Sequence, residues 1–215
     1  MNDAIRKFLT AAERLEIEKR VKTAESGTSG EIVVMAVGAS SHYPSATMAG
    51  GATIALLLSI TGMYQLRSEN MWLFLMLFAL MFIAAHELVK RIPLLKRPFA
   101  ARREMVEEVE EASIKAFYLR KVHETTHRAG IFIYISLFER SVRVLADRGI
   151  DAKAGPQAWK EIVDLITNGI NAGRQSEAII EAVDRCAALL RLHFPGSGPG
   201  LNELGDVMII GTPDH

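Results

Sequence analysis

The sequence predicts a small α/β domain that is interrupted by a pair of membrane-spanning helices. Two short apolar runs, at residues 31–37 and 131–137, have the length and the β-branched composition of buried strands. Segments with helical periodicity lie before the first run and after the second. Two long apolar segments with almost no charged residues stand between the runs.

The composition excludes several classes of function. The 215 residues carry 25 basic and 25 acidic side chains, so no overall positive field favours nucleic-acid binding. The single cysteine, Cys186, excludes an intrachain disulfide. The sequence motifs of P-loop proteins, dinucleotide-binding proteins, α/β-hydrolases and zinc ribbons do not occur. We therefore expect no nucleic-acid partner.

The first helix is predicted from a capping box. Thr10 and Glu13 have the spacing at which the threonine hydroxyl accepts from a helix N–H and the glutamate reaches back to the cap. A surface helix is expected from there to about residue 25, with Ile17 and Val21 buried along one stripe. The first apolar run follows, and we expect it to be a central strand that is covered on both faces.

The two long apolar segments predict a transmembrane hairpin. Residues 46–64 are about as long as the 20 residues that cross a bilayer core, and a second candidate spans residues 71–89. Because only residues 65–70 separate them, the two spans are expected to pack as a helical hairpin. The alternative, two buried helices of a large soluble core, needs more surrounding protein than the chain provides.

Basic residues set the predicted orientation of the hairpin. The loop between the spans has only Arg67, beside Glu69, whereas six basic residues follow the second span. By the positive-inside rule, the loop faces outward and both termini lie in the cytoplasm. The same basic side chains are suited to anionic lipid headgroups. The six are Lys90, Arg91, Lys96, Arg97, Arg102 and Arg103.

The second half of the chain predicts a helix, a strand pair and two further helices. The helix is expected from about residue 104 to 126, and the strand pair follows it. In that pair the run 131–137 is the buried strand, and the weaker alternation of residues 142–146 suits a strand nearer an edge. Pro156 fits the first turn of the next helix, and Ser176 is expected to cap the last one.

Residues 123–127, His-Glu-Thr-Thr-His, fit the zinc-protease pattern. Two histidines one helical turn apart can hold Zn²⁺ while the glutamate between them activates a water molecule. Here the helix is expected to end at once, and neither Glu139 nor Asp151 is well placed as a third ligand. The alternative is that His123 and His127 face solvent or lie at the helix C-terminus, where positive charge is favoured. Zinc proteolysis is therefore the third functional hypothesis.

A polar segment with a glycine follows the second strand of the pair, at residues 147–151. We expect a loop at the carboxyl end of that strand, because open α/β sheets usually bind their ligands at such ends. Asp147 and Asp151 are candidates for binding Ca²⁺ or Mg²⁺ or for sharing a proton in acid/base chemistry. The alternative is that both carboxylates satisfy backbone N–H groups of the loop.

Two segments resemble the TPM domain family. The first is the strand entry Thr-Ser-Gly-Glu-Ile-Val-Val at residues 28–34, and the second is the strand pair from Gly130 to Ile150, which ends in Ala-Asp-Arg-Gly-Ile. The family includes lumenal photosystem II repair proteins and many bacterial membrane or secreted relatives. The resemblance covers most of the chain outside the hairpin, including the closing residues 202–204. It implies a three-layer α/β/α sandwich with a small mixed sheet.

The resemblance also implies site residues and activities. Weak acid phosphatase action and Ca²⁺ binding are proposed for some members, and others resemble assembly or repair accessories of membrane complexes. This chain departs from the family in two ways. The matching loop is often richer in glycine, and Asp147 and Arg148 change its charge here. Many relatives are exported, whereas no signal peptide is expected in this chain. The residues that match family positions and become binding candidates are Glu31, Arg128, Gly130, Asp147, Gly149 and Asp151.

Four regions are therefore predicted. Residues 1–42 give the first helix and strand, 43–90 the transmembrane hairpin, 91–195 the rest of the TPM-like domain, and 196–215 a loose tail in which residues 207–210 can add a short strand. The predicted function is a non-enzymatic binding or assembly factor for membrane-protein complexes, held in the cytoplasmic membrane. A weak metal-dependent phosphatase that uses Ca²⁺ or Mg²⁺ is the alternative. The lipid bilayer and other membrane proteins are the expected partners.

Overall fold

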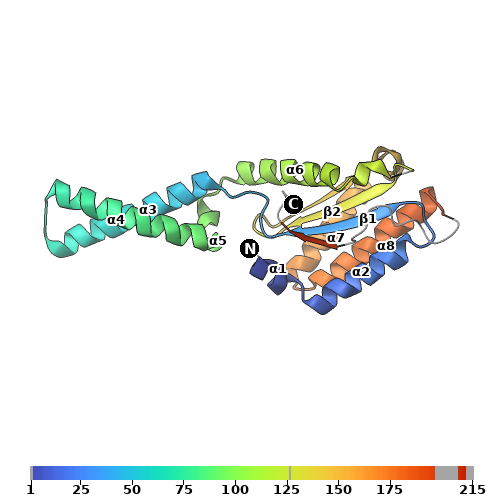
Figure 1. Cartoon of the computed structure of the whole chain (residues 1–215), viewed down its shortest axis with the longest axis horizontal. Coiled ribbons are helices and arrows are strands. Elements are labelled where there is room, and N and C mark those ends of the chain that lie inside the picture. The colour runs from blue at the N-terminus through green and yellow to red at the C-terminus, as the bar shows by residue number, and fades with distance from the viewer. Residues whose placement is uncertain (1, 126, 197–207, 212–215) are drawn as a thin grey trace. The chain divides into compact units, whose positions relative to one another are not determined.

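The computed structural model describes residues 2–125, 127–196 and 208–211 (Figure 1). The chain forms two compact units. Unit 1 consists of Met1–Ser40 and Glu108–His215, and unit 2 of Ser41–Glu107. The second unit is inserted into the first between its first strand and the rest of its elements.

Unit 1 contains a four-stranded sheet in the order β3-β2-β1-β4. Its strands are β1 (Glu31–Val37), β2 (Gly130–Ser136), β3 (Ser141–Ala146) and β4 (Met208–Gly211). β1 runs parallel to both β2 and β4, and β3 runs antiparallel to β2. The predicted mixed sheet, the edge position of β3 and the short strand near the C-terminus are thus confirmed. The predicted match at residues 202–204 lies outside the described residues.

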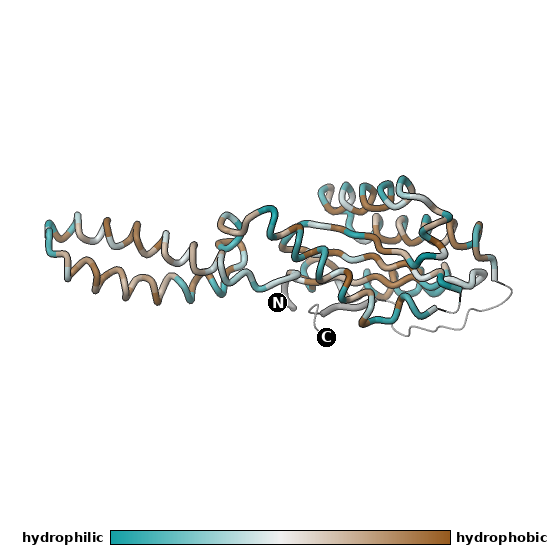
Figure 2. The backbone as a smooth tube through the Cα atoms, turned by 90° about the horizontal axis from the view of Figure 1, so that it is seen from above, coloured by the Kyte–Doolittle hydropathy of each residue, from teal (hydrophilic) through white to brown (hydrophobic). Residues whose placement is uncertain are grey.

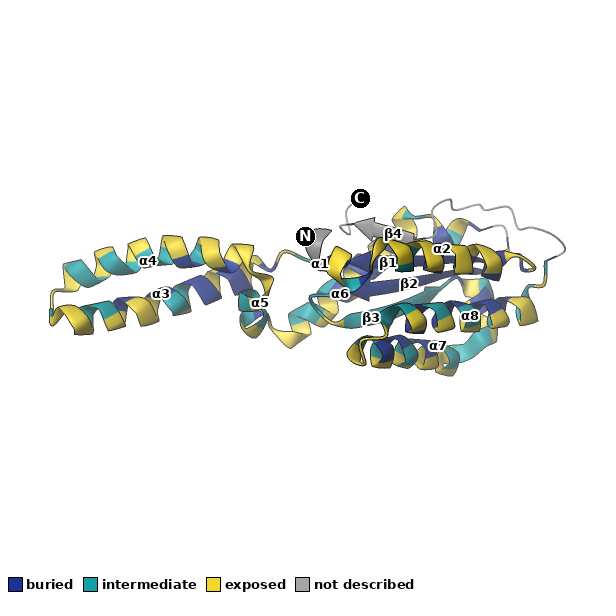
Figure 3. Ribbon diagram, turned by 90° about the horizontal axis from the view of Figure 1, so that it is seen from below, coloured by how far each residue is buried: buried dark blue, intermediate teal, exposed yellow. Residues whose placement is uncertain are grey.

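Helices cover both faces of this sheet and give three layers (Figures 1 and 3). α2, α7 and α8 pack on one face, and the part of α6 that belongs to unit 1 packs on the other. The predicted α/β/α sandwich is therefore confirmed. The helices concerned are α1 (Asn2–Phe8), α2 (Ala11–Glu25), α6 (Arg102–Leu119), α7 (Arg148–Asn171) and α8 (Gln175–His193).

The two central strands are apolar because each of their faces meets a different core. Ile32 and Ile131 are neighbours in register, and both enter the core shared with α2, α7 and α8. Val33 and Phe132, the next pair, enter the core beneath α6. A polar group buried in a strand that is covered on both sides must form a hydrogen bond, so most polar residues of these strands lie near the strand ends.

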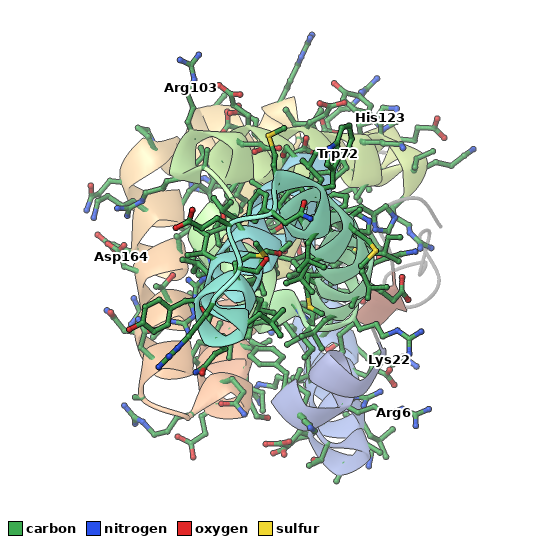
Figure 4. All side chains as sticks on the ribbon, turned by 90° about the vertical axis from the view of Figure 1, so that its left-hand side faces the viewer. Arg6, Lys22, Trp72, Arg103, His123 and Asp164 are labelled. Carbon is green, nitrogen blue, oxygen red and sulfur yellow. The ribbon has the colours of Figure 1, made fainter. Side chains whose placement is uncertain are left out.

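α2 begins with the predicted capping box. Thr10 Oγ1 accepts from the Glu13 N–H at 3.3 Å, and Glu13 Oε2 accepts from the Thr10 N–H at 2.7 Å. Ile17 and Val21 are fully buried, as the stripe predicts. Polar side chains on the outer surface, such as those of Lys22 and Asp164, point away from the core (Figure 4).

α6 ends earlier than the sequence predicts. The helix stops at Leu119 rather than near residue 126, and Lys121 adopts a left-handed backbone conformation with φ of 57°. A short 3₁₀ turn, η2 (Val122–Glu124), follows and buries Val122 completely. The sequence signal for this stop is weak, because neither glycine nor proline marks it.

Residues 147–151 do not form the predicted loop. Asp147 is the N-cap of α7, and its Oδ1 accepts from the Arg148 N–H at 2.7 Å, so the helix begins at the expected ligand-binding loop. Gly155, with φ of 75°, breaks α7, and Pro156 starts its second part, as predicted. The predicted cap of α8 is wrong, because that helix already starts at Gln175 and Ser176 lies inside its first turn.

Unit 2 is a helical hairpin followed by a short basic segment. α3 (Pro44–Leu66) and α4 (Met71–Arg91) are joined by residues 67–70, and the Asn70 side chain caps α4. Both helices are long and apolar enough to cross a membrane (Figure 2). They approach closely at Gly51, where a Cβ atom would lie 3.0 Å from the Cα of His86. The hairpin continues into α5 (Pro93–Lys96) and η1 (Arg97–Phe99).

Candidate functional site

The segment after β3 lies at the amino ends of the parallel strands, not at their carboxyl ends. Because β3 is antiparallel to β2, its end meets the start of β2, and the Asp147 N–H donates to the Gly130 carbonyl at 2.8 Å. Gly130 in turn pairs with Glu31 at the start of β1. The rule that places ligands at carboxyl ends refers to parallel strands, so it does not apply to this segment.

The structure brings three of the predicted site residues into one row. Glu31, Gly130 and Asp147 follow one another across β1, β2 and the end of β3. Arg128 precedes this row with φ of 53°, and its Nη1 donates to the His123 carbonyl at 2.8 Å. Through these backbone contacts, the residues that match family positions form the amino edge of the sheet.

Asp151 takes no part in this row. Its exposed side chain accepts from the Trp159 indole N–H at 2.8 Å, whereas Asp147 is 4% exposed and caps α7. The two carboxylates are therefore held by different partners. The predicted acidic pair is not assembled as a pair of free carboxylates.

Both glycines among the predicted site residues allow close backbone contacts. A Cβ atom on Gly130 would lie 2.2 Å from the Val122 carbonyl oxygen, and one on Gly149 would lie 2.5 Å from the Arg128 carbonyl oxygen. Such distances are far below van der Waals contact, and the obstructing atoms belong to the backbone. The two glycines let η2 and the start of α7 pack against the amino edge of the sheet.

A further buried acid at this edge was not predicted as a site residue. Glu25 is the last residue of α2, and its Oε1 accepts from the Ile32 N–H at 2.9 Å. Burial raises the pKa of Glu25 to about 7; the hydrogen bond from Ile32 opposes this shift, and the nearby charge of Glu31 adds to it. The sequence did hold a signal, because Glu25 continues the buried stripe of Ile17 and Val21 at helical spacing.

Together these groups form what we call the amino-edge cluster, which is Glu25, Thr28, Glu31 and Asp147. All four side chains are buried. Thr28 is satisfied on both sides, since its hydroxyl donates to the Phe194 carbonyl at 2.9 Å and accepts from the Gly30 N–H at 3.1 Å. Asp147 differs, because its buried Oδ2 finds no hydrogen-bond partner among the described residues.

A second polar cluster, which was not predicted from the sequence, lies at the carboxyl ends of β1 and β2. We call it the carboxyl-edge cluster: Ser40, Tyr134, Ser136 and Glu139. Ser40 Oγ lies 3.1 Å from both the Tyr134 hydroxyl and Ser136 Oγ. Glu139 accepts from the Ser40 N–H at 2.8 Å and from the Ser136 hydroxyl. The sequence pattern that could have indicated this cluster is the alternation of Tyr134 and Ser136, two residues with hydroxyl groups, within an otherwise apolar strand.

The histidine motif does not have the geometry of a zinc site. His123 lies in η2 and is half-buried, with its ring centroid 4.7 Å from that of Tyr118, whereas His127 lies beyond η2 and is exposed. The two histidines therefore do not share one face of a continuous helix, which the motif requires. Within the described ranges, no group of three or more His, Cys, Asp or Glu residues is arranged to hold a metal ion.

The fold and the paired strand ends define a three-layer α/β/α domain with a mixed sheet. Residues 102–189 match the sequence model of the TPM domain. This match includes the second of the two family-like segments, Gly130 to Ile150, whereas the first, at residues 28–34, lies outside it. A comparison with curated proteins gave no match.

A solved structure shares this fold. The chain is similar to the NMR structure of the BA42 protein from the psychrophilic bacterium Bizionia argentinensis, with a TM-score of 0.58 and 17% sequence identity. The similarity covers 95% of this chain and 96% of the other. At this identity the likeness supports the fold alone.

Proposed function

We propose that this protein is a membrane-anchored TPM-domain protein that acts by binding, as an assembly or maintenance factor for membrane-protein complexes. The observation that carries the anchoring is the apolar outer surface of the hairpin. Large apolar side chains of α3 and α4 are exposed all along both helices, and Ile83 is 69% exposed. Contiguous apolar surface of this extent marks contact with a membrane or a partner.

The proposed orientation keeps unit 1 and both termini in the cytoplasm. It follows from the basic residues at the end of α4 and beyond it, and from the loop between the helices, in which Arg67 is the only basic residue and lies beside Glu69. In this arrangement the TPM domain is available to cytoplasmic segments of other membrane proteins. Those proteins are the proposed partners.

The binding role is supported by the way the two candidate carboxylates are held. Asp147 uses one oxygen to cap α7, and Asp151 accepts from Trp159, so each has a structural task. A carboxylate that caps a helix is stabilised by the partial positive charge of the helix N-terminus. Both groups thus contribute to the shape of the domain.

A weak phosphatase remains the second proposal, because two observations at the amino edge favour it. Asp147 keeps one buried oxygen without a partner among the described residues, and the raised pKa of Glu25 allows this carboxyl to exchange a proton near neutral pH. A metal-dependent reaction would need Ca²⁺ or Mg²⁺ at Asp147. Zinc proteolysis, the third hypothesis from the sequence, finds no support in the arrangement of His123 and His127.

One set of assays on the full-length protein in vesicles separates these proposals. We expect no phosphatase turnover with Ca²⁺, Mg²⁺ or Mn²⁺ above that of the variant Asp147→Asn/Asp151→Asn, in which asparagine preserves the cap. Robust phosphatase turnover that disappears in the variant would contradict the binding role and support catalysis. Stoichiometric zinc that is lost in His123→Ala would instead revive the protease.

A cysteine-accessibility experiment tests the anchoring. Cys186 is buried and is replaced by alanine, and single cysteines are then introduced at Ser68 and Ser26. In intact cells an impermeant reagent should label position 68 and not position 26. Labelling of position 26 alone would reverse the topology, and release of the protein by alkaline carbonate would contradict the membrane anchor itself.

A further inference from the structure

The chain does not run straight from α4 into α6 but folds back across the base of the hairpin. α5 and η1 form this return, and both contact α3. The Phe99 ring lies against Gly50, where a Cβ atom would come within 3.0 Å of the ring and 3.3 Å of Val89. Gly50 therefore makes room for Phe99, and this contact holds the return segment in place.

Four cations that lie on the return segment or directly beside it in the sequence form no ion pair with an acidic side chain in the described part of the chain. We call these residues the basic collar: Lys90, Lys96, Arg97 and Arg102. No ion pair among the described residues involves any of them. The collar cations therefore form no direct ion pair in the described part of the chain, although Lys90 also interacts with Glu87 at longer range.

The acids nearest in the sequence are already engaged elsewhere. Glu87 pairs with Arg91 at 2.9 Å and Glu107 with Arg103 at 2.7 Å. Glu104 accepts from the Ser45 hydroxyl at 3.0 Å. The collar thus has unused capacity for an anion that comes from outside the chain.

Two of these cations repel each other on the folded segment. Lys96 is half-buried, and burial together with the charge of Lys90 lowers its pKa. An anion placed between the two ammonium groups would offset both effects. Leu94 on the same segment is 73% exposed. A segment that combines exposed apolar and cationic side chains matches the boundary between lipid headgroups and acyl chains.

We propose that the basic collar binds the phosphate groups of anionic phospholipids in the membrane that the hairpin spans. This inference rests on the proposed membrane anchoring. Fixed cations at a helix end attract anionic headgroups more strongly than zwitterionic ones. Since Phe99 fixes the segment, the collar is pre-organised, and less ordering is needed when a headgroup binds.

The test uses the full-length protein reconstituted in vesicles of phosphatidylcholine alone or with phosphatidylglycerol. After extraction in mild detergent, native mass spectrometry measures which lipids stay bound. We expect wild type to retain phosphatidylglycerol over phosphatidylcholine, and the variant Lys90→Gln/Lys96→Gln/Arg97→Gln/Arg102→Gln to lose this preference at least tenfold. Flotation and resistance to carbonate establish for each variant that the hairpin is inserted.

A matched control removes four exposed cations from unit 1, as Arg6→Gln/Lys7→Gln/Lys19→Gln/Lys22→Gln. Arg6 and Lys22 project from the surface of α1 and α2 (Figure 4). The control should keep the wild-type lipid preference. If the control and the collar variant lose it equally, net charge explains the effect, and the collar is not a site.

The variant Phe99→Ala separates the fold of the segment from its charge. It keeps all four cations but removes the contact with Gly50, and we expect a smaller loss of preference, about threefold. Full displacement of the bound lipid by inorganic phosphate would overturn the assignment to lipid. Insertion of wild type without any lipid preference would overturn this inference and leave the anchor intact, whereas failure of insertion would overturn both.

Discussion

The two polar ends of the sheet differ in how completely their groups are satisfied. At the carboxyl edge, Ser40, Ser136 and Glu139 form hydrogen bonds with one another. At the amino edge, Glu25 is buried with a raised pKa, and Asp147 has a buried oxygen without a partner among the described residues. The carboxyl edge therefore fixes a turn, whereas the amino edge holds buried acidic groups at an electrostatic cost. A cost of this kind is more often found at functional sites.

The largest effect is expected from Gly130→Ala at the amino edge. The new Cβ atom would lie 2.2 Å from the Val122 carbonyl oxygen, and β2 or η2 must move to relieve the overlap. We expect a loss of about 3 kcal/mol in the free energy of unfolding. Urea denaturation of the full-length protein in detergent measures it, with Trp159 as the only reporter in a Trp72→Phe background.

The matched control for this substitution is Gly27→Ala. Gly27 has φ of 97°, but no atom lies within 4 Å of the position that a Cβ atom would take, so only backbone strain of about 1 kcal/mol is expected. If both variants lose the same free energy of unfolding, the close packing at Gly130 does not contribute to stability.

A smaller, pH-dependent effect is expected from Glu25→Gln. The pKa of Glu25 is raised from 4.5 to about 7 in the folded protein, so the folded state holds its proton more tightly than the unfolded state. The stabilisation from this group is complete below pH 4.5 and is lost as the pH rises through 7. At pH 8 the variant should be more stable than wild type by about 2 kcal/mol, and at pH 4 the difference should vanish.

The measurement is a series of urea unfolding curves for both proteins from pH 4 to pH 8. The glutamine amide oxygen can still accept from the Ile32 N–H, so the hydrogen bond at this position is retained. Glu16→Gln, on the exposed side of the same helix, is the control and should leave the pH profile unchanged. A variant profile parallel to that of wild type would contradict the assignment of the proton to Glu25.

The smallest effect is expected at the carboxyl edge, from Glu139→Ala. The substitution leaves the Ser40 N–H and the Ser136 hydroxyl without their acceptor. We expect a loss of about 1–2 kcal/mol in the free energy of unfolding. The same denaturation assay tests this, with Glu16→Ala as the control. A loss as large as that of Gly130→Ala would show that the two edges are equally important for stability.

The sequence was sufficient to predict those structural features that depend on a local pattern of residues. The capping box at Thr10 and Glu13, the buried run of β2 and the break before Pro156 each depend on residues within one or two turns. The two apolar helices also follow from composition and length alone. These features were predicted because local hydrogen bonding and hydrophobic periodicity determine them.

The candidate site was harder to predict because strand direction determines its place. Residues that match a family motif could be identified, but the sequence could not show that β3 returns Asp147 to the amino ends of the parallel strands. The sequence allowed Asp147 to bond a backbone N–H, as the alternative for this carboxylate stated, but it did not show that a helix begins there instead of a loop. The carboxyl-edge cluster joins Ser40 to Glu139 across 99 positions, and no local pattern reports such a contact.

By itself, the sequence determined the α/β class, the membrane-length hairpin, the family resemblance and the residues that could carry function. Only the tertiary structure decided which of these residues meet. Glu25 became a buried acid because α2 ends beside β1, and Phe99 fixed the basic collar because Gly50 leaves space for its ring. Burial and long-range contact create these properties, since the same side chains in an unfolded chain would be solvated and separate.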